Sequence, residues 1–211
     1  MMKKYVQFGC GLSAPKEWLN FDVSPTLRIQ KTPILGTLLK NQLNTRFPEN
    51  VLYGDILKGL PLENESCDAL YSSHTLEHLS LEDLRLALKN VYVLLKPDGI
   101  FRCVLPDLEW AAKTYIENLS ANKQTASIDF LNETLLGERN RKRGLKAIAS
   151  SILGNSKHLW MWDYLSLSNE LEEAGFRNIR RCAFNDSKDP MFEHVESEGR
   201  FENALAIECQ K

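Results

Sequence analysis

Acidic and glycine residues follow several short apolar runs in the first part of the chain, where they are placed to bind a ligand. Gly9 and Gly11 follow the first run, Asp22 ends the second, and Asp55 and Ile56 follow the third. Glycine lets the backbone pass close to a ligand, and a carboxylate can accept hydrogen bonds from both hydroxyls of a ribose. We expect Asp22 to bind a ribose, Asp55 to accept from an adenine amino group and Ile56 to pack on that ring. Each acid taken alone is equally typical of a loop cap.

Two patterns in the same region compete with this interpretation. The stretch from Gly9 to Ala14 satisfies the Gly-x-Gly-x-x-Gly/Ala pattern of dinucleotide-binding proteins. However, Asp22 follows it too early and Pro15 interrupts the expected crossover helix. The stretch from His74 to His78 fits the His-x-x-Glu-His signature of inverted zinc peptidases, in which two histidines on one helix face bind a metal. It follows a predicted strand directly, which argues against a peptidase.

Alternating strand and helix patterns must position these residues. We predict strands at residues 5–8, 19–23, 51–53, 68–72, 100–105, 179–184 and 204–209. A capping box at Ser80 and Asp83 opens one predicted helix, and another begins at Ser166 and ends at Gly175. The last two strands have no helix between them and should pair antiparallel. The pattern predicts an α/β fold with a doubly wound, seven-stranded, mostly parallel sheet.

Two segments depart from this alternation. Only Leu12 to Trp18 separate the first two strands, so a crossover helix there has two turns at most. Residues 107–160 are long, polar and largely helical, which predicts a cap that shapes an acceptor pocket. The proline-containing region between the second and third strands is expected to hold a helix at Leu35–Leu43. We expect residues 1–211 to form one domain with this helical insertion.

The composition narrows the function classes and the location. The 211 residues include 26 basic and 28 acidic side chains, a formal net charge of −2, which does not favour nucleic acid or an anionic membrane as a partner. The basic run from Arg139 to Arg143 is more typical of a solvated face than of an RNA contact. Five scattered cysteines indicate neither a disulfide framework nor a zinc ribbon. Without a signal peptide or a run long enough to cross a bilayer, we expect a cytoplasmic protein.

Eight different short motifs lie along the chain, mostly at the ends of the predicted strands. These motifs are Val6 to Gly11, Trp18 to Asp22, Leu60 to Leu62, Asp68 to Leu79, Leu94 to Gly99, Leu105 to Leu108, His158 to Asp163 and Glu173 to Phe176. Together they resemble class I S-adenosylmethionine-dependent methyltransferases, in particular a small uncharacterised bacterial branch of the type 11 group. The resemblance covers nearly the whole chain and implies a Rossmann-like methyltransferase fold with S-adenosylmethionine as the cofactor.

This resemblance assigns cofactor contacts to the strand ends. By similarity, the two glycines face the methionine part of the cofactor, the two strand-end acids its ribose and adenine, and Ser73 and His74 the region of the methyl group. The expected cofactor-binding residues are Phe8, Gly9, Cys10, Gly11, Asp22, Val23, Asp55, Ile56, Ser73 and His74. The sequence departs from the family pattern at Asp98, where glycine is usual, and in the short link that truncates the glycine-rich loop.

The candidate catalytic residues are His74, Asp107 and His158. Methyl transfer is an in-line displacement from a sulfonium, so positioning supplies much of the rate. A base is needed only to remove a proton from an oxygen or a poorly nucleophilic nitrogen, and histidine suits that task. Trp160 and Trp162 are the candidate substrate-binding residues, since they can stack on a sugar or ring acceptor, although core packing is an equal alternative.

A metal site is a further alternative at the same strand end. In RNA 2′-O-methyltransferases and ubiquinone-pathway O-methyltransferases, a Glu-x-x-Glu-His motif at this position resembles a magnesium site. Here His74 takes the first position, which is a poorer ligand for a hard cation. We therefore expect no metal, with Glu77, His78 and His158 as the ligands if one binds. Otherwise Glu77 and His78 would anchor the loop by hydrogen bonds.

The sequence therefore predicts an S-adenosylmethionine-dependent methyltransferase that acts on a small-molecule or glycan-type acceptor by O- or N-methylation. Three alternatives remain: a catalytically silent protein that binds the cofactor, an NAD-dependent oxidoreductase, and an RNA methyltransferase, which would need a basic surface. The acceptor and the oligomeric state are left open.

Overall fold

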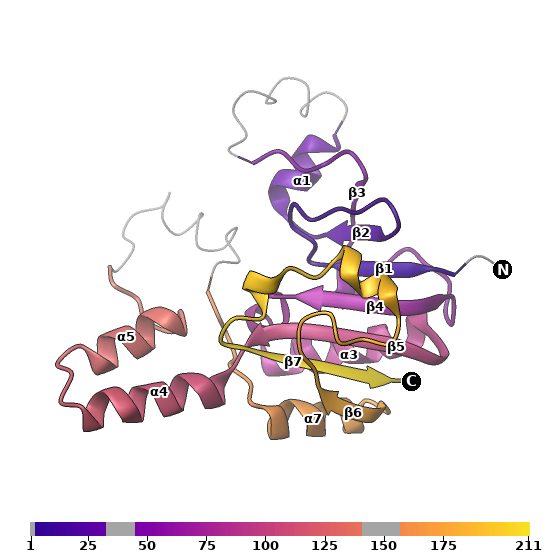
Figure 1. The fold of residues 1–211 in the computed structure, drawn as a ribbon. Helices are drawn as coiled ribbons and strands as arrows, with labels where there is room; N and C mark the ends of the chain where they lie inside the picture. The colour runs from indigo at the N-terminus through magenta and orange to yellow at the C-terminus, as the bar shows by residue number, and fades with distance from the viewer. Residues whose placement is uncertain (1–2, 33–44, 141–156) are drawn as a thin grey trace.

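Seven strands form one mixed sheet in the order β3-β2-β1-β4-β5-β7-β6 (Figure 1). The computed structural model describes residues 3–32, 45–140 and 157–211. Its strands are β1 (Tyr5–Phe8), β2 (Leu19–Asp22), β3 (Val51–Tyr53), β4 (Cys67–Ser73), β5 (Leu95–Pro106), β6 (Arg177–Arg181) and β7 (Ala204–Gln210). The first five strands pair in parallel, whereas β7 pairs antiparallel with β5 and β6. The predicted α/β sheet is confirmed.

Two strands, β5 and β6, differ from the predicted ends by more than one residue. Strand β6 ends at Arg181 rather than at Phe184, because the backbone N–H of Ala183 donates to the Asp186 carboxylate at 2.9 Å and the chain turns away from the sheet. Strand β5 begins at Leu95, directly after a helix, and includes the turn of residues 96–99, which precedes the predicted strand. Within that turn Asp98 has a φ of 63°, a left-handed conformation that glycine adopts most easily and aspartate tolerates.

Two helices, α3 (Leu81–Leu94) and α7 (Tyr164–Glu173), cover one face of the sheet. Their apolar sides include Leu84, Leu88 and Leu171, all fully buried against the strands. The predicted capping box is present, since the Ser80 hydroxyl accepts from the backbone N–H of Asp83 at 3.3 Å. Helical periodicity in the sequence therefore located this layer, although α7 begins at Tyr164, two residues before the predicted start at Ser166.

The opposite face has a different cover, in which no α-helix of the described residues takes part in the apolar cluster. It is packed by Trp18, from the short β1–β2 link, and by Phe192 and Val195, from the segment between β6 and β7. This segment contains the short 3₁₀ helices η3 (Pro190–His194) and η4 (Glu198–Arg200). The Trp18 indole donates to the carbonyl of Met191 at 3.0 Å. The ten residues that link β1 to β2 are too few for a crossover helix, so one large aromatic side chain fills the space.

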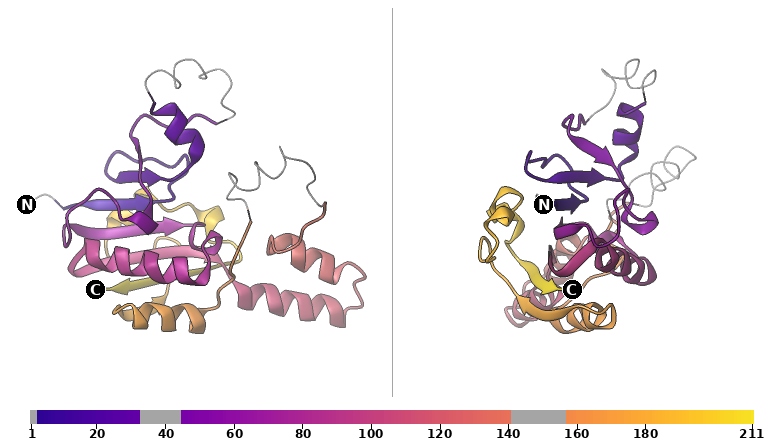
Figure 2. Two further views of the ribbon diagram at one scale, coloured as in Figure 1. Left: turned by 180° about the vertical axis from the view of Figure 1, so that it is seen from behind. Right: turned by 90° about the vertical axis from the view of Figure 1, so that its right-hand side faces the viewer.

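The segment after β5 forms a helical pair beyond the carboxyl ends of the parallel strands. Helices α4 (Leu108–Ser120) and α5 (Ala126–Glu133) project from that end of the sheet (Figures 1 and 2). They form the described part of the predicted cap over 107–160, of which residues 141–156 lie outside the described residues. Part of the basic run at 139–143 and the whole of the predicted helix Leu35–Leu43 also lie outside them. A short helix, α1 (Pro25–Gln30), follows β2.

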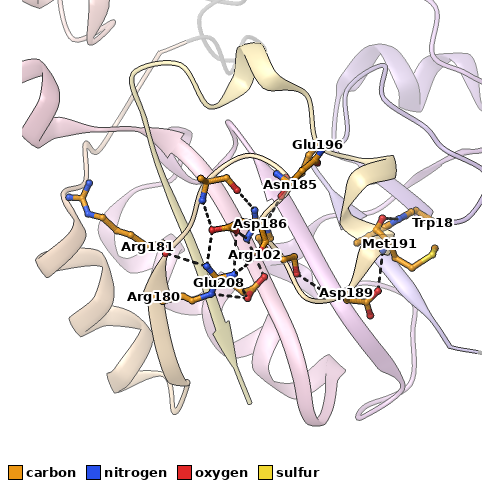
Figure 3. A network of polar contacts seen from close by, with 12 residues as sticks. Trp18, Arg102, Arg180, Arg181, Asn185, Asp186, Asp189, Met191, Glu196 and Glu208 are labelled. Carbon is orange, nitrogen blue, oxygen red and sulfur yellow. Dashed lines mark hydrogen bonds and ion pairs between the residues drawn. The ribbon is translucent and has the colours of Figure 1, made fainter.

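A buried arginine joins the 182–203 segment to the sheet (Figure 3). Arg102 on β5 has no exposed surface, and its guanidinium bonds to Glu196, to Asp186 at 2.9 Å and to Glu208 at 3.1 Å. It also donates to the carbonyl of Ala183 at 2.6 Å. A guanidinium in this environment is satisfied only while the segment stays folded over β5.

We expect Arg102→Ala to lower the free energy of unfolding by about 3–5 kcal/mol, because it leaves buried carboxylates without their cation. Urea-induced unfolding of the purified variant measures this. The matched control is Arg85→Ala, which removes a surface guanidinium bound to Glu82 and Glu170 and should cost about 1 kcal/mol or less. Equal costs for the two variants would contradict a structural role for Arg102.

The free energy of unfolding should also fall at low pH, because Asp186 becomes protonated. Burial alone would raise the pKa of Asp186, but hydrogen bonds from Arg180, Ala183 and Arg102 outweigh it and lower the pKa from its ordinary 3.8 to about 2. A carboxyl with a depressed folded-state pKa stabilises the fold above its ordinary pKa and loses that contribution as the pH falls toward the folded value. The unfolding free energy of the wild type minus that of Asp186→Asn should therefore shrink between about pH 4 and pH 2. A difference that does not change with pH over this range would disprove the linkage.

Candidate functional site

Two hollows meet at the carboxyl ends of the parallel strands. The first, which we call the strand-end hollow, has a volume of about 550 Å³ and is lined by residues that include Gly9, Asp22 and Thr75. The second, the helix-side hollow, has a volume of about 340 Å³ and lies between the end of β5, α4 and the segments around Thr134 and His158. Ligands of open parallel sheets bind at this edge.

A third hollow of about 360 Å³ lies between α3 and α7. Its lining includes Arg85, Lys89 and Glu170, of which Arg85 and Glu170 are tied together in an ion pair. It lies on the helix layer rather than at the strand ends, so we do not consider it the functional site.

The two glycines after β1 serve different needs. Gly9 has a φ of +63°, and a Cβ placed on it would lie 2.1 Å from Oγ1 of Thr75. Any side chain there would collide with the loop after β4, so Gly9 lets two strand-end loops touch. Gly11 has a φ of +55°, and a Cβ on it would meet no atom within 4 Å. Its conformation requires glycine, and its side toward solvent stays open.

Asp22 organises the floor of the strand-end hollow. It is 9% exposed, one carboxylate oxygen accepts from the backbone N–H of Gly11 at 2.9 Å, and the other accepts from that of Ser24 at 2.8 Å. Each carboxylate oxygen has a second lone pair. The residue can therefore hold the β1 loop and still accept hydrogen bonds from a ligand diol.

Other expected cofactor residues lie beside the strand-end hollow rather than in its lining. Asp55 accepts from the backbone N–H of Leu57 at 3.0 Å and caps the 3₁₀ helix η1 (Ile56–Lys58). Phe8 and Ile56 are core residues. Burial, and then the Asp22 charge, raise the pKa of the Cys10 thiol to about 12, so it is not a nucleophile at neutral pH.

Of the expected cofactor set, four residues line the strand-end hollow: Gly9, Asp22, Val23 and His74. Ser73 and Gly11 do not line it, and the Ser73 hydroxyl is buried without a hydrogen-bond partner among the described residues. The start of α1 with its N-cap, residues 24–26, also lines the hollow and was not predicted from the sequence. A proline at the first helical position after a strand-end acid was the available signal.

All three expected catalytic residues line the helix-side hollow, and two of them, Asp107 and His158, line that hollow alone. Asp107 also stabilises the fold there. As the N-cap of α4 it accepts from the backbone N–H of Glu109 at 2.8 Å, and it forms an ion pair with Arg181 at 3.3 Å. Burial lowers the pKa of His158, an effect that the Glu77 charge opposes.

His74, the third expected catalytic residue, lines both hollows. Its φ of 50° is uncommon for a residue with a side chain. The ring nitrogen Nε2 lies 2.9 Å from the carbonyl of Arg200 on the 182–203 segment, and Nδ1 lies 3.4 Å from a carboxylate oxygen of Glu77. A strained backbone and two contacts hold this imidazole where the hollows meet.

Trp160 and Trp162 lie near the helix-side hollow but do not line it, whereas Met161 between them does. Trp162 is 2% exposed in the main core, and its carbonyl accepts from the backbone N–H of Leu108 at 2.9 Å. Trp160 is 43% exposed. Substrate binding by these two side chains stays a prediction.

The loop after β4 carries a cluster of ionisable groups around Glu77, in the 3₁₀ helix η2 (Leu76–His78). Glu77, His78 and His158 each offer one ligand atom within 4.8 Å of the others. The backbone carbonyl of Glu77 accepts from Leu159 at 2.8 Å and from Trp160 at 3.2 Å, which brings His158 to this loop.

Among the described residues, no helix has the length and hydrophobicity that a bilayer crossing requires.

The chain is similar to methyltransferases both in sequence and in fold. A family described as "Methyltransferase domain" matches residues 6–103. No curated protein matches the sequence significantly. Among solved structures, a SAM-dependent methyltransferase from Thermotoga maritima, described as a possible histamine N-methyltransferase, is 16% identical with a TM-score of 0.52, over 100% of this chain and 83% of that one. A SAM-dependent methyltransferase from Archaeoglobus fulgidus is 16% identical with a TM-score of 0.49, over 99% and 86%.

The matched region runs from β1 into β5 and therefore includes the glycines, Asp22 and the loop that carries His74 and Glu77. Because the identity to the Thermotoga protein is only 16%, this likeness shows a shared fold and no more. Residues 6–103 therefore match a methyltransferase family in sequence, and the chain as a whole shares its fold with an S-adenosylmethionine-dependent methyltransferase.

Proposed function

We propose that this enzyme transfers a methyl group to an oxygen or nitrogen of a small-molecule or glycan-type acceptor. In this proposal S-adenosylmethionine occupies the strand-end hollow and the acceptor occupies the helix-side hollow. The observation that carries the proposal is that His74 lines both hollows. A methyl donor and an acceptor must meet in line at a distance near van der Waals contact, and adjoining hollows with a shared wall satisfy that need.

The residues around the strand-end hollow fit the cofactor. Asp22 retains free carboxylate lone pairs for a ribose, and the open side of Gly11 leaves room for the methionine part. Asp55 and Ile56, at the adjoining end of β3, are the proposed neighbours of the adenine. S-adenosylmethionine, when bound, supplies an electrophilic methyl group on a sulfonium.

The helix-side hollow favours a small acceptor that is neutral or cationic. Its volume of about 340 Å³ is at the lower end of the range for small-molecule sites. Three acids, Asp107, Glu133 and Glu202, are among its lining residues, and Trp110 and Met161 add apolar surface. Acidic side chains repel phosphate groups, so this lining and the net charge of −2 argue against RNA as the acceptor.

His74 is the proposed proton acceptor for an oxygen nucleophile, because it alone of the three candidate catalytic residues borders both hollows. Asp107 is held by its helix cap and by Arg181, which suits it to orient the acceptor rather than to exchange protons. His158 lines the same hollow and is a second proposed contact for the acceptor.

Titration calorimetry tests the cofactor site. We expect S-adenosylmethionine and S-adenosylhomocysteine to bind and NAD not to bind. Asp22→Ala should weaken both cofactor affinities at least tenfold, about 1.4 kcal/mol, because it removes the ribose acceptor. The matched control is Asp68→Ala, which removes an aspartate at the amino-terminal end of β4, paired with Lys96.

The control should keep the wild-type affinity, and thermal unfolding of both variants checks that they are folded. Tight binding of NAD in place of the cofactors would contradict the proposal and favour the oxidoreductase alternative. An equal loss in Asp22→Ala and Asp68→Ala would mean that Asp22 acts only through the fold.

Methyl-labelled S-adenosylmethionine tests the acceptor class. The enzyme is incubated with a cell extract divided into low-molecular-mass, protein and RNA fractions, with Asp22→Ala as the inactive control. We expect label to be transferred to compounds of the low-molecular-mass fraction by the wild type only. Transfer to RNA would overturn the proposed acceptor, and cofactor binding without transfer to any fraction would favour the catalytically silent alternative.

A further inference from the structure

We propose that Glu77, His78 and His158 bind a divalent first-row transition-metal cation at the junction of the two hollows. The first observation is the gathering of the histidines. The chain has four, and three of them, His74, His78 and His158, lie around the single carboxylate of Glu77.

Glu77 is a buried acid that receives no side-chain or backbone hydrogen bond on its carboxylate from the part of the chain that the structure describes. It is 1% exposed, and neither carboxylate oxygen has a hydrogen-bond partner among the described residues. Its neighbours are the ring nitrogens of His74 at 3.4 Å and His158 at 3.9 Å, which are beyond a good hydrogen bond. A carboxylate removed from water is costly unless a cation compensates it, so this arrangement leaves a place for positive charge.

One proposed ligand, His78, and the neighbouring His74 each place a ring nitrogen beside a backbone carbonyl, whereas Nδ1 of His158 has no hydrogen-bond partner among the described residues. Nδ1 of His78 lies 2.8 Å from the carbonyl of Lys157, and Nε2 of His74 lies 2.9 Å from the carbonyl of Arg200. A nitrogen beside a carbonyl carries the proton, which leaves Nε2 of His78 and Nδ1 of His74 with free lone pairs. Nδ1 of His74 is the atom that faces Glu77. Metal-binding histidines commonly donate their second N–H to a backbone carbonyl in this way.

The backbone holds the ligands together from two distant parts of the chain. The Glu77 carbonyl accepts hydrogen bonds from Leu159 and Trp160, and the rings of His78 and His158 lie edge to face with centroids 5.1 Å apart. With one ligand atom of each residue within 4.8 Å of the others, small side-chain rotations bring all three to the bonds of about 2.1 Å in a tetrahedral site.

The ligand chemistry selects the cation. Two imidazoles and one carboxylate suit zinc and similar divalent transition metals, whereas magnesium prefers oxygen ligands in an octahedral arrangement. Three protein ligands leave one position of a tetrahedral site open. Because His158 lines the helix-side hollow and His78 the strand-end hollow, that position adjoins the proposed meeting point of donor and acceptor. Only this last role rests on the proposed function, since metal binding itself does not.

Cobalt and zinc titrations of chelator-treated protein test the site without an acceptor or S-adenosylmethionine. We expect one Co²⁺ per chain, with weak visible bands of a nitrogen and oxygen environment and without the intense sulfur-to-cobalt band that a cysteine ligand would add. Zn²⁺ should displace it, and Mg²⁺ should not. Glu77→Gln and His158→Ala should each weaken Co²⁺ binding by about 100-fold or more.

The matched control is His194→Ala. His194 lies in η3, 4.0 Å from Glu17 and away from the cluster, so its removal should leave the Co²⁺ affinity unchanged. Binding that survives in Glu77→Gln and His158→Ala, or is lost equally in His194→Ala, would overturn the proposal, as would the absence of Co²⁺ binding to the wild type.

Thermal unfolding separates a metal site from a structural anchor. If Glu77 compensates a cation, the metal-free Glu77→Gln variant should be at least as stable as the metal-free wild type, because the substitution removes a buried charge. Zn²⁺ should then raise the thermal unfolding midpoint of the wild type but not that of the variant. If Glu77 anchors the loop through charged histidines, Glu77→Gln should be less stable without metal, which would contradict the proposal. S-adenosylmethionine binding, measured separately by calorimetry, keeps failure of the metal site distinct from failure of the methyltransferase assignment.

Discussion

The buried ion pairs of Arg102 support both the second face of the sheet and the site. The guanidinium binds three carboxylates and a carbonyl, and so holds the chain between β6 and β7 against β5. That segment supplies Phe192 to the core and the carbonyl that binds Nε2 of His74. Without a helix in the short β1–β2 link, the apolar cluster on this face is smaller than the cluster under the helices. A satisfied charge network therefore does the positioning that helices perform on the other face.

A second constraint lies in the backbone after β4. The carbonyl of Glu77 receives two N–H groups from the chain around residue 160, and the same stretch extends into a bridge between Asp107 and Trp162. These contacts bring the region after the α4–α5 pair back to the sheet. They explain why His158, 80 positions away from His78, shares a wall of the site with it. Main-chain hydrogen bonds hold this stretch around residue 160 in place and so form one side of the helix-side hollow. These bonds do not depend on which side chains the residues carry.

The site combines conformational strain with charge. His74 adopts a left-handed backbone conformation and Gly9 avoids a collision with Thr75, so the loops after β1 and β4 meet closely at the strand ends. Such conformations persist only when the surrounding contacts hold them. Here Asp22 contacts the loop after β1, and the 182–203 segment contacts His74 in the loop after β4. The junction between the two hollows is thus built by residues that lie far apart in the sequence.

The sequence by itself determined the local and periodic features: the seven strands, the capping box at Ser80, the antiparallel end of the sheet and the strand-end positions of Asp22 and His74. These follow from hydrophobic period and turn chemistry, which act over a few residues. The tertiary structure alone decided that Trp162 is a core residue, that Asp107 is bound to Arg181, and that Arg102 is fully buried. It also decided that Asp55 caps a turn beside the hollow rather than lining it. Such roles depend on partners distant in sequence, and an isolated charged or aromatic residue carries no local signal of the partner that it will find.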